Sequence, residues 1–409
     1  MADKPLLTLA DIEQAADQLA GQVIETPTIP APMLSDTLGC PLWLKLENLQ
    51  YTSSFKVRGA TLAIAALEPE QKKRGVITMS AGNHAQAVAF RASQMGIPAT
   101  IVMPKQTPFA KVNRTRSYGP QIVLEGRNLN ECEETVQQLM AEKGLALIHP
   151  YDNLEVIRGQ GTVGLEILAA VPDLDCLVVP IGGGGLISGI AVAAKALNPK
   201  IRIIGVEAEL YPSMSQTLAG QPVQCGGETL AEGIAVKAPG QLTRDLASRY
   251  VDEILLVSEA QLEWATGALV EQQRVIAEGA GAAGIAAIRA HPKLFAGQKT
   301  GVVICGGNID SRLLASILTR NMVSDGRMVR LRIDISDEPG MLAAIASAIS
   351  DCGGNVVEVY HQRLFYNVPA KLAKIDVVID TRGPDHVQEI RSALINKGFK
   401  VAMIDEQSG

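Results

Sequence analysis

The feature that most restricts how this chain can fold is a repeated alternation of short apolar runs with longer helical patterns. Six runs have the length and composition of buried strands, at residues 42–46, 75–79, 99–103, 176–181, 202–206 and 301–305. Helical patterns lie between them, for example at 84–95, 186–197 and 261–277. This alternation predicts an α/β fold, in which helices wrap a mostly parallel sheet and ligands bind at the carboxyl ends of the strands.

The pattern changes after Asn321, where residues 323–328 are predicted to form a linker. Strands are expected at 329–335, 355–361, 374–379 and 399–404, with helices at 339–350 and 384–397. The order βαββαβ in about eighty residues is typical of a ferredoxin-like module. We therefore predict a first domain at 1–322, containing a smaller mobile subdomain at about 53–151, and a second domain at 329–409.

Composition excludes several classes of protein. The net charge is −6, and the densest basic stretch, residues 327–332, alternates with apolar residues like the polar face of a strand, so no nucleic-acid surface is expected. The six cysteines are far apart without a CxxC pair, which favours reduced thiols over disulfides or zinc. The N-terminus lacks the order of a signal peptide, and no uncharged apolar run has membrane-spanning length. We expect a cytoplasmic protein that binds no membrane.

Four segments could carry chemistry. Lys56 follows Ser54 and Phe55, and it is either a solvated surface lysine or a partly desolvated lysine able to form a Schiff base. Residues 80–84 (Ser-Ala-Gly-Asn-His) join a predicted strand to a helix, as a plain capped turn or as an anion site. Cys305 ends another strand, either as a buried apolar filler or as a functional thiol.

The fourth segment is a run of glycines, which directly follows the strand at 176–181 and consists of Gly182, Gly183, Gly184 and Gly185 before Leu186. It is neither a P-loop nor a GxGxxG motif, since no Lys-Ser/Thr pair follows and Ile187 or Ser188 takes the third glycine position. Because four consecutive glycines cost backbone entropy, a nest of amides around a phosphate explains them better than a structural role.

Taken together, these segments strongly resemble the fold-type II pyridoxal-phosphate enzymes, in particular the threonine and serine dehydratases. The resemblance runs from roughly Thr8 to Asn321 and includes Lys-Leu-Glu-Asn-Leu-Gln at 45–50, Ser-Phe-Lys-Val-Arg-Gly-Ala at 54–60 and Cys-Gly-Gly-Asn at 305–308. It implies two open, mostly parallel sheets wrapped by helices. It also implies pyridoxal 5'-phosphate as the cofactor and elimination of water and ammonia from a small hydroxy amino acid as the reaction.

The resemblance also implies roles for individual residues. Lys56 would bind the cofactor covalently beside Phe55 and then remove the α-proton as general base. Asn83 would hydrogen-bond the 3′-hydroxyl of the cofactor, and Cys305 would face its pyridine nitrogen. The phosphate would be held by the backbone of Gly182, Gly183, Gly184, Gly185 and Leu186, and the substrate carboxylate by Ser80, Ala81, Gly82, Asn83 and His84. We assign no residue to a metal.

Two positions depart from many relatives. Ser53 replaces the glycine of a Thr-Gly-Ser segment, and Cys305 replaces a serine. Neither a hydroxyl nor a thiol would enforce a protonated pyridine ring, and the weaker electron sink that results suits elimination, because a leaving group on the β-carbon drains the developing carbanion.

The C-terminal module resembles an ACT domain. Its Asp-Glu-Pro-Gly-Met-Leu turn at 337–342 matches the family's D-x-P-G-x-L segment, and Gly-Gly-Asn-Val at 353–356 precedes the second strand. An oligomerisation appendage is the plain alternative. The resemblance implies a homodimer or homotetramer that binds an amino-acid effector through Glu338, Pro339, Gly340, Met341, Leu342 and Asn355.

Rival functions remain open. A serine racemase needs a second acid–base group opposite the lysine, where this chain has Ala81, so elimination is favoured. A β-replacing synthase shares the fold, but the segment at 80–84 and the C-terminal module favour a dehydratase. A 3-hydroxyaspartate ammonia-lyase is a further alternative. A non-catalytic amino-acid sensor is disfavoured by the intact Lys56, Asn83 and glycine run.

Overall fold

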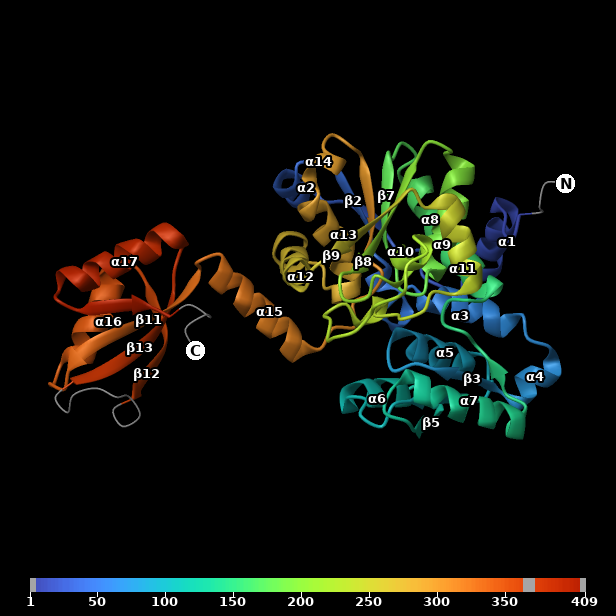
Figure 1. The fold of residues 1–409 in the computed structure, drawn as a ribbon, viewed down its shortest axis with the longest axis horizontal. Coiled ribbons are helices and arrows are strands. Elements are labelled where there is room, and N and C mark those ends of the chain that lie inside the picture. The colour runs from blue at the N-terminus through green and yellow to red at the C-terminus, as the bar shows by residue number, and fades with distance from the viewer. Residues whose placement is uncertain (1–4, 363–371, 405–409) are drawn as a thin grey trace. The chain divides into compact units, whose positions relative to one another are not determined.

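The computed structural model describes residues 5–362 and 372–404 (Figure 1). Contacts divide the chain into two compact units, Met1–Asp310 and Ser311–Gly409. The first unit contains two mostly parallel sheets, as predicted, and the second contains an antiparallel sheet. Within the described residues, no helix is both long and apolar enough to cross a membrane.

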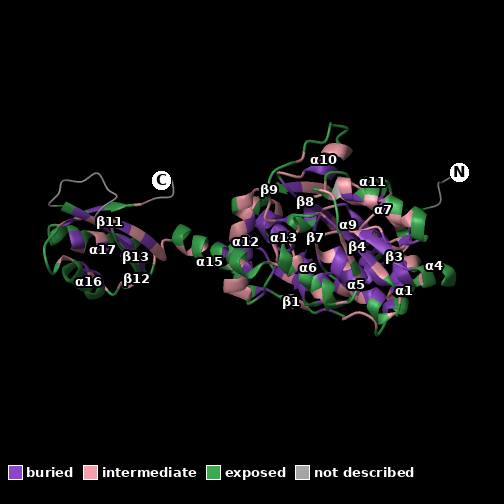
Figure 2. Cartoon of the chain, turned by 90° about the horizontal axis from the view of Figure 1, so that it is seen from below, coloured by how far each residue is buried: buried purple, intermediate pink, exposed green. Residues whose placement is uncertain are grey.

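The larger sheet of the first unit has six strands and includes the predicted runs at 42–46, 176–181, 202–206 and 301–305. Its order is β1 (Thr28–Pro30), β2 (Leu42–Lys45), β10 (Thr300–Val303), β7 (Cys176–Pro180), β8 (Arg202–Ala208) and β9 (Glu253–Val257). Only the pairing of β1 with β2 is antiparallel. Strand β7 is buried along its whole length, which explains its continuous apolar sequence (Figure 2).

The smaller sheet of the first unit is parallel and contains the other two predicted runs. Its order is β5 (Gln121–Leu124), β4 (Ala99–Met103), β3 (Val76–Met79) and β6 (Ala146–Leu147). These strands fall within 53–151, the range expected for the smaller subdomain, whose mobility stays a prediction.

Helices cover both sheets, and they begin where local sequence satisfies their free amides. Helix α1 (Leu9–Leu19) starts after Thr8, which forms the expected capping box with Asp11. The other helical segments of this unit are α2 (Pro32–Leu38), α3 (Lys56–Ala65), α4 (Pro69–Arg74), α5 (Asn83–Gln94), α6 (Phe109–Arg116), α7 (Leu129–Lys143), α8 (Leu154–Ala170), α9 (Gly185–Leu197), α10 (Ser213–Leu218), α11 (Gln241–Tyr250), α12 (Glu259–Gln273), α13 (Gly279–Ala290), α14 (Pro292–Phe295) and the 3₁₀ turns η1 (Glu47–Leu49), η2 (Tyr51–Ser53) and η3 (Glu232–Ile234).

The second unit has the predicted order βαββαβ after one additional helix. It consists of α15 (Ser311–Ser324), β11 (Met328–Ser336), α16 (Met341–Asp351), β12 (Asn355–Gln362), β13 (Leu372–Asp380), α17 (Pro384–Asn396) and β14 (Lys400–Met403). The sheet order is β12-β13-β11-β14, and all pairings are antiparallel. Along β11 buried residues alternate with more exposed ones, and Arg330 and Arg332 pair with Asp376, so the basic stretch is the polar face of a strand.

The division between the units lies before α15, whereas the sequence placed the boundary at residue 322. Residues 323–324 end this helix, and Gly326, with φ of +67°, makes the turn into β11. No glycine or proline interrupts the helix before that turn, so the chain continues helical through the predicted boundary.

A cluster of four charges, three of them buried and one partly exposed, fixes helix α3 in the first unit. The Arg58 guanidinium donates to both oxygens of Glu47 at 2.8 Å and to Glu166 at 2.5 and 2.8 Å. Lys45 also donates to Glu166, at 2.5 Å. Arg58 and Glu47 are fully buried. Burial alone would raise the pKa of Glu47, but Arg58 and Lys45 lower it overall, so the carboxylate stays charged.

We predict that Arg58→Met destabilises the protein by about 3–5 kcal/mol, because it leaves the buried Glu47 charge without its main partner. The control is Arg127→Met, which removes an exposed i,i+4 pair with Glu131 and should leave the free energy of unfolding nearly unchanged. Urea unfolding of both variants measures the difference. Equal losses would contradict a structural role for the cluster.

Candidate active site

Lys56 lies at the N-terminal end of α3, where the chain is tied to the end of β10. The Phe55 backbone N–H donates to the Cys305 carbonyl oxygen at 3.2 Å, and Ser54 forms an isolated bridge with Gly306. The Lys56 Nζ donates to the Pro150 carbonyl oxygen at 2.8 Å. The two sequence-predicted residues Lys56 and Cys305 are thus brought to one place.

The surroundings of Lys56 favour its neutral form. Burial lowers the pKa of the Lys56 amine to about 8, although Cys305 and Glu278 act in the opposite direction. Burial, with Glu278, raises the pKa of the Cys305 thiol well above its ordinary range. The site therefore contains an amine that can become nucleophilic near neutral pH beside a thiol that stays protonated.

The glycine run forms the turn between β7 and α9, and close neighbours exclude larger residues from it. A Cβ atom on Gly183 would lie 2.2 Å from the Tyr151 ring, and one on Gly184 would lie 2.7 Å from the Met214 side chain. Gly184 also has φ of +92°, a conformation that residues with a side chain rarely adopt. Glycine is therefore required at position 183 by the Tyr151 ring and at position 184 by both its neighbours and its backbone conformation.

This turn presents free amides at the start of a buried helix. Gly184 is the N-cap of α9, and the Ser188 N–H makes the first helical bond to its carbonyl oxygen at 3.0 Å. The N–H groups of Gly185, Leu186 and Ile187 precede that bond, so they have no acceptor within the helix. Such a turn can bind an anion such as a phosphate.

The predicted substrate segment follows β3 and begins α5. Ser80, Ala81, Gly82 and Asn83 are partly exposed, and the Gly82 N–H donates to the Ser80 hydroxyl at 3.2 Å. His84 is buried, with its Nε2 atom 2.8 Å from the Ile148 carbonyl oxygen, and burial lowers its pKa to about 3. The imidazole is therefore neutral and directed at the backbone of Ile148.

Asn83 joins this segment to the residues around Cys305. Its Nδ2 donates to Glu278 Oε1 at 2.7 Å, and its Oδ1 accepts from Asn308 Nδ2 at 2.8 Å. Asn308 also donates to the Thr52 carbonyl oxygen at 2.7 Å, so the loop before Lys56 belongs to the same network.

Sequence reasoning missed Glu278, Tyr151 and the role of Asn308. Glu278 is the N-cap of the apolar helix α13, and a lone carboxylate at the start of an apolar segment was the available signal. Asn308 ends the Cys-Gly-Gly-Asn motif, and its bond to Asn83 joins residues too far apart in the sequence for a local pattern to reveal. No local pattern marks Tyr151, whose ring lies over Gly183 only because the chain folds back there.

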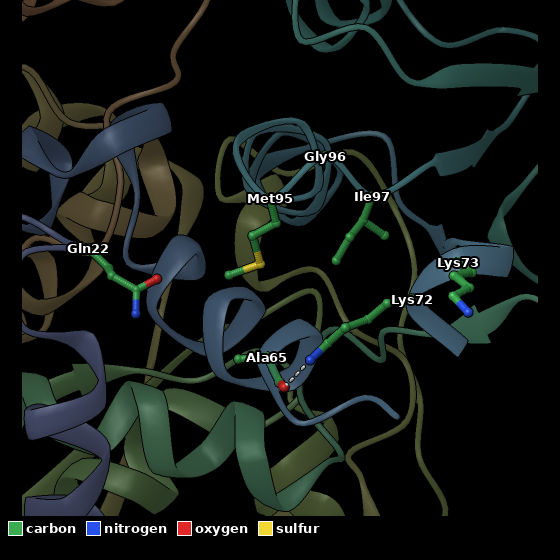
Figure 3. Close-up of a pocket in the computed structure, with 7 residues that line it drawn as sticks. All are labelled: Gln22, Ala65, Lys72, Lys73, Met95, Gly96 and Ile97. Carbon is green, nitrogen blue, oxygen red and sulfur yellow. Dashed lines mark hydrogen bonds between the residues drawn. The ribbon is translucent and has the colours of Figure 1, made fainter. Parts of the chain in front are cut away.

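A hollow of the surface lies at the C-terminal end of α3, away from Lys56 (Figure 3). Its lining comes from Gln22, Ala65, Lys72, Lys73, Met95, Gly96 and Ile97. The Lys72 amine donates to the Ala65 carbonyl oxygen at 2.7 Å, and Lys73 pairs with Glu70. Both lysines thus have partners, and none of the residues around Lys56 lines this hollow.

The predicted effector residues lie on the surface of the second unit. Glu338, Pro339, Gly340 and Leu342 are exposed, and Met341 is partly buried. Gly340, with φ of +92°, is the N-cap of α16, and Asn355 begins β12. The turn is therefore open to solvent at the start of an eleven-residue helix.

The chain is similar to known proteins over most of its length. The sequence model of the family described as "Pyridoxal-phosphate dependent enzyme" matches residues 19–306. The L-threonine ammonia-lyase of Thermotoga maritima is 44% identical over 402 residues, which are 98% of this chain and 100% of that protein.

Two solved structures resemble the first unit. Maize serine racemase has a TM-score of 0.72 at 35% identity, covering 78% of this chain and 99% of its own. The processed form of threonine deaminase isoform 2 from Solanum lycopersicum has a TM-score of 0.72 at 34% identity, covering 76% and 86%.

Proposed function

The chain belongs to the pyridoxal-phosphate dependent enzyme family, and we propose that it is a threonine ammonia-lyase. It would convert L-threonine to 2-oxobutanoate and ammonia, and L-serine to pyruvate and ammonia. The observation that carries this function is the cluster of Lys56, Asn83 and Cys305 beside a glycine turn with free amides. The similarity to the Thermotoga maritima enzyme over 98% of this chain supports the choice of reaction.

The residues present fit pyridoxal 5'-phosphate. Lys56 offers a primary amine for covalent attachment, and the turn of Gly182, Gly183, Gly184, Gly185 and Leu186 would hold the phosphate. Asn83 has an amide for the ring hydroxyl, and the neutral Cys305 thiol would face the ring nitrogen. The buried Ser54 hydroxyl and His84 Nδ1 have no hydrogen-bond partner in the described structure, as expected where a polar ligand completes a site.

When bound, the cofactor supplies an electron sink for negative charge at the substrate α-carbon. The backbone of residues 80–84 would orient the substrate carboxylate at the start of α5. Lys56 would then remove the α-proton, which its lowered pKa allows near neutral pH. Loss of the β-hydroxyl as water leaves an enamine that hydrolyses to the 2-oxo acid and ammonia.

Elimination is favoured over racemisation by the residue at position 81. Lys56 would serve one face of the α-carbon, and the Ala81 methyl group cannot transfer a proton at the other. The similarity to maize serine racemase makes serine racemisation the relevant alternative. A steady-state comparison of threonine, serine and 3-hydroxyaspartate separates the remaining ammonia-lyase activities.

We predict that Lys56→Ala abolishes 2-oxo acid production and the visible absorbance of the lysine-bound cofactor. The reason is that both the attachment point and the base are lost, while the glycine turn still binds free cofactor. The control is Lys72→Ala in α4, which should keep the rate and the absorbance. Turnover by Lys56→Ala at more than about a hundredth of the wild-type rate would contradict the role, because general-base catalysis contributes about 10²–10⁴ in rate.

A second prediction concerns the face opposite Lys56. Ala81→Ser should add slow interconversion of L- and D-serine, because it places a hydroxyl where the wild type has only a methyl group, and some elimination should remain. Chiral chromatography of serine recovered from the reaction measures this. Ala66→Ser, at the exposed end of α3, is the control and should add no D-serine. A wild type that racemises serine as fast as it dehydrates it would contradict the account.

We further propose that the second unit is an ACT domain through which an amino acid regulates catalysis in a homo-oligomer. The βαββαβ order and the solvent-exposed turn at Gly340 support this, since the first amides of α16 are available to a carboxylate. Asn355 of a neighbouring subunit would complete the site. Branched-chain amino acids are the first candidates, because 2-oxobutanoate feeds their synthesis.

We predict that one such amino acid shifts the half-saturating threonine concentration by about 5–150-fold, the usual range of allosteric coupling. Asn355→Ala should weaken the response, and a chain ending at Asp310, where the first unit ends, should be active without responding. Lys397→Ala, after α17, is the control. If no proteinogenic amino acid binds by calorimetry or changes the kinetics of the full chain, the unit is purely structural.

A further inference from the structure

The carboxyl group of Glu278 occupies a space that two neighbouring glycines leave open. Glu278 caps α13, and its backbone N–H donates to the Gly306 carbonyl oxygen at 3.1 Å. A Cβ atom on Gly306 would lie 2.6 Å from Glu278 Oε1, and one on Gly233 would lie 3.0 Å from it. Two separate loops thus have glycine where a side chain would displace this carboxyl group.

The hydrogen bonds of Asn83 show what the carboxyl group does. An amide has two N–H donors at one end and an oxygen acceptor at the other, and a flip would exchange them. Glu278 accepts from Nδ2 at 2.7 Å, and Asn308 donates to Oδ1 at 2.8 Å. A carboxylate cannot donate, so this arrangement permits only one orientation and leaves the second N–H of Asn83 for another acceptor.

The Asn308 side chain is itself held from a different element. Arg114 of α6 donates to Asn308 Oδ1 at 2.7 Å, which directs the Asn308 amide nitrogen toward Asn83. The chain of side chains Arg114–Asn308–Asn83–Glu278 therefore has the same donor direction at each link, ending on the carboxyl group.

We propose that Glu278 is a positioning residue, whose carboxylate orients the Asn83 amide so that its free N–H meets the cofactor. The expected effect of Glu278 on threonine turnover rests on the proposed function. Its expected effect on cofactor binding does not. Neither the family resemblance at residues 54–60 nor the glycine run points to Glu278.

The charge on Glu278 changes in the working pH range. Burial raises its pKa to about 7, against the lowering effect of Asn83. The groups that face it are Asn83, Glu232, Lys111, the Asn308 backbone, Lys56 and Cys305. Above pH 7 the carboxylate makes a charge-assisted bond to Asn83, and below pH 7 the neutral acid makes a weaker one.

The test compares Glu278→Gln and Glu278→Ala with the wild type in two measurements between pH 5.5 and 8.5. One is the dissociation constant of pyridoxal 5'-phosphate from protein freed of cofactor, followed by fluorescence. The other is kcat/KM for threonine. The control is Glu232→Gln, which removes a nearby charge paired with Lys111 that makes no bond to Asn83.

Each variant is expressed as a ratio to the wild type at the same pH. Because Glu278 raises the pKa of Lys56, the cofactor-binding ratio is also measured in the Lys56→Ala background, where that titration is absent. At pH 8.5 Glu278→Gln should bind cofactor and turn over about five- to tenfold less well, since a charged hydrogen bond is roughly twice as strong as a neutral one. At pH 5.5 the ratio of Glu278→Gln to the wild type should approach one. The change between the two limits should have its midpoint near pH 7, the pKa of Glu278. Glu278→Ala should remain impaired at both pH values, and Glu232→Gln should match the wild type at pH 8.5.

A Glu278→Gln ratio that stays constant with pH, or wild-type cofactor affinity in Glu278→Ala, would overturn the proposal. Far-UV circular dichroism of each cofactor-free variant identifies a failure to fold, and Glu278→Gln, which keeps the size of the side chain, then remains the decisive comparison. If wild-type protein binds cofactor but does not deaminate threonine, the proposed function fails while the binding ratios still decide the role of Glu278.

Discussion

The N-terminal turn of α3 is held by a cluster of charges, and the position of Lys56 follows from it. The cluster consists of the buried Arg58, Glu47 and Lys45 and the partly exposed Glu166. Arg58 lies two residues after Lys56, so any movement of the reactive amine along the helix would separate Arg58 from two carboxylates. Helices α3 and α8 also approach each other closely at Gly59. A Cβ atom at that position would lie only 2.5 Å from the Nε2 atom of Gln160 in α8. Burial of Arg58 and Glu47 makes a partly broken cluster costly, because it would leave a buried charge without its partner.

Each of the two sheets contributes functional groups to the site around the Lys56 amine. The larger sheet contributes the glycine turn after β7 and the thiol after β10, and the smaller sheet contributes the segment after β3. The cluster contains uncharged groups at Cys305 and His84, while Lys56 and Glu278 both titrate near neutral pH. These groups suit proton removal from a bound amino acid better than reactions that need a strong acid beside the ring.

Local patterns predicted six strands of the first unit, because parallel strands buried on both faces have continuous apolar sequences that glycine and polar turns interrupt. They missed β1, β5, β6 and β9, which are short or partly exposed and so lack such a run. The glycine run and Lys56 were likewise visible, since such residues are costly or unusual in plain structural positions. Glu278 and Tyr151 were not, because their roles depend on contacts with residues about two hundred and about thirty positions away. The predicted boundary at residue 322 lies inside α15, whereas the contacts divide the units before that helix, at Asp310.

The central claim is that Lys56 binds the cofactor. Borohydride reduction of the wild-type enzyme, followed by protease digestion and mass spectrometry of the peptides, tests it most directly. The account predicts one pyridoxyl adduct, on Lys56, and none on Lys45, whose amine is engaged with Glu166 and the Thr26 carbonyl oxygen. An adduct on a different lysine, with Lys56 unmodified, would contradict the account.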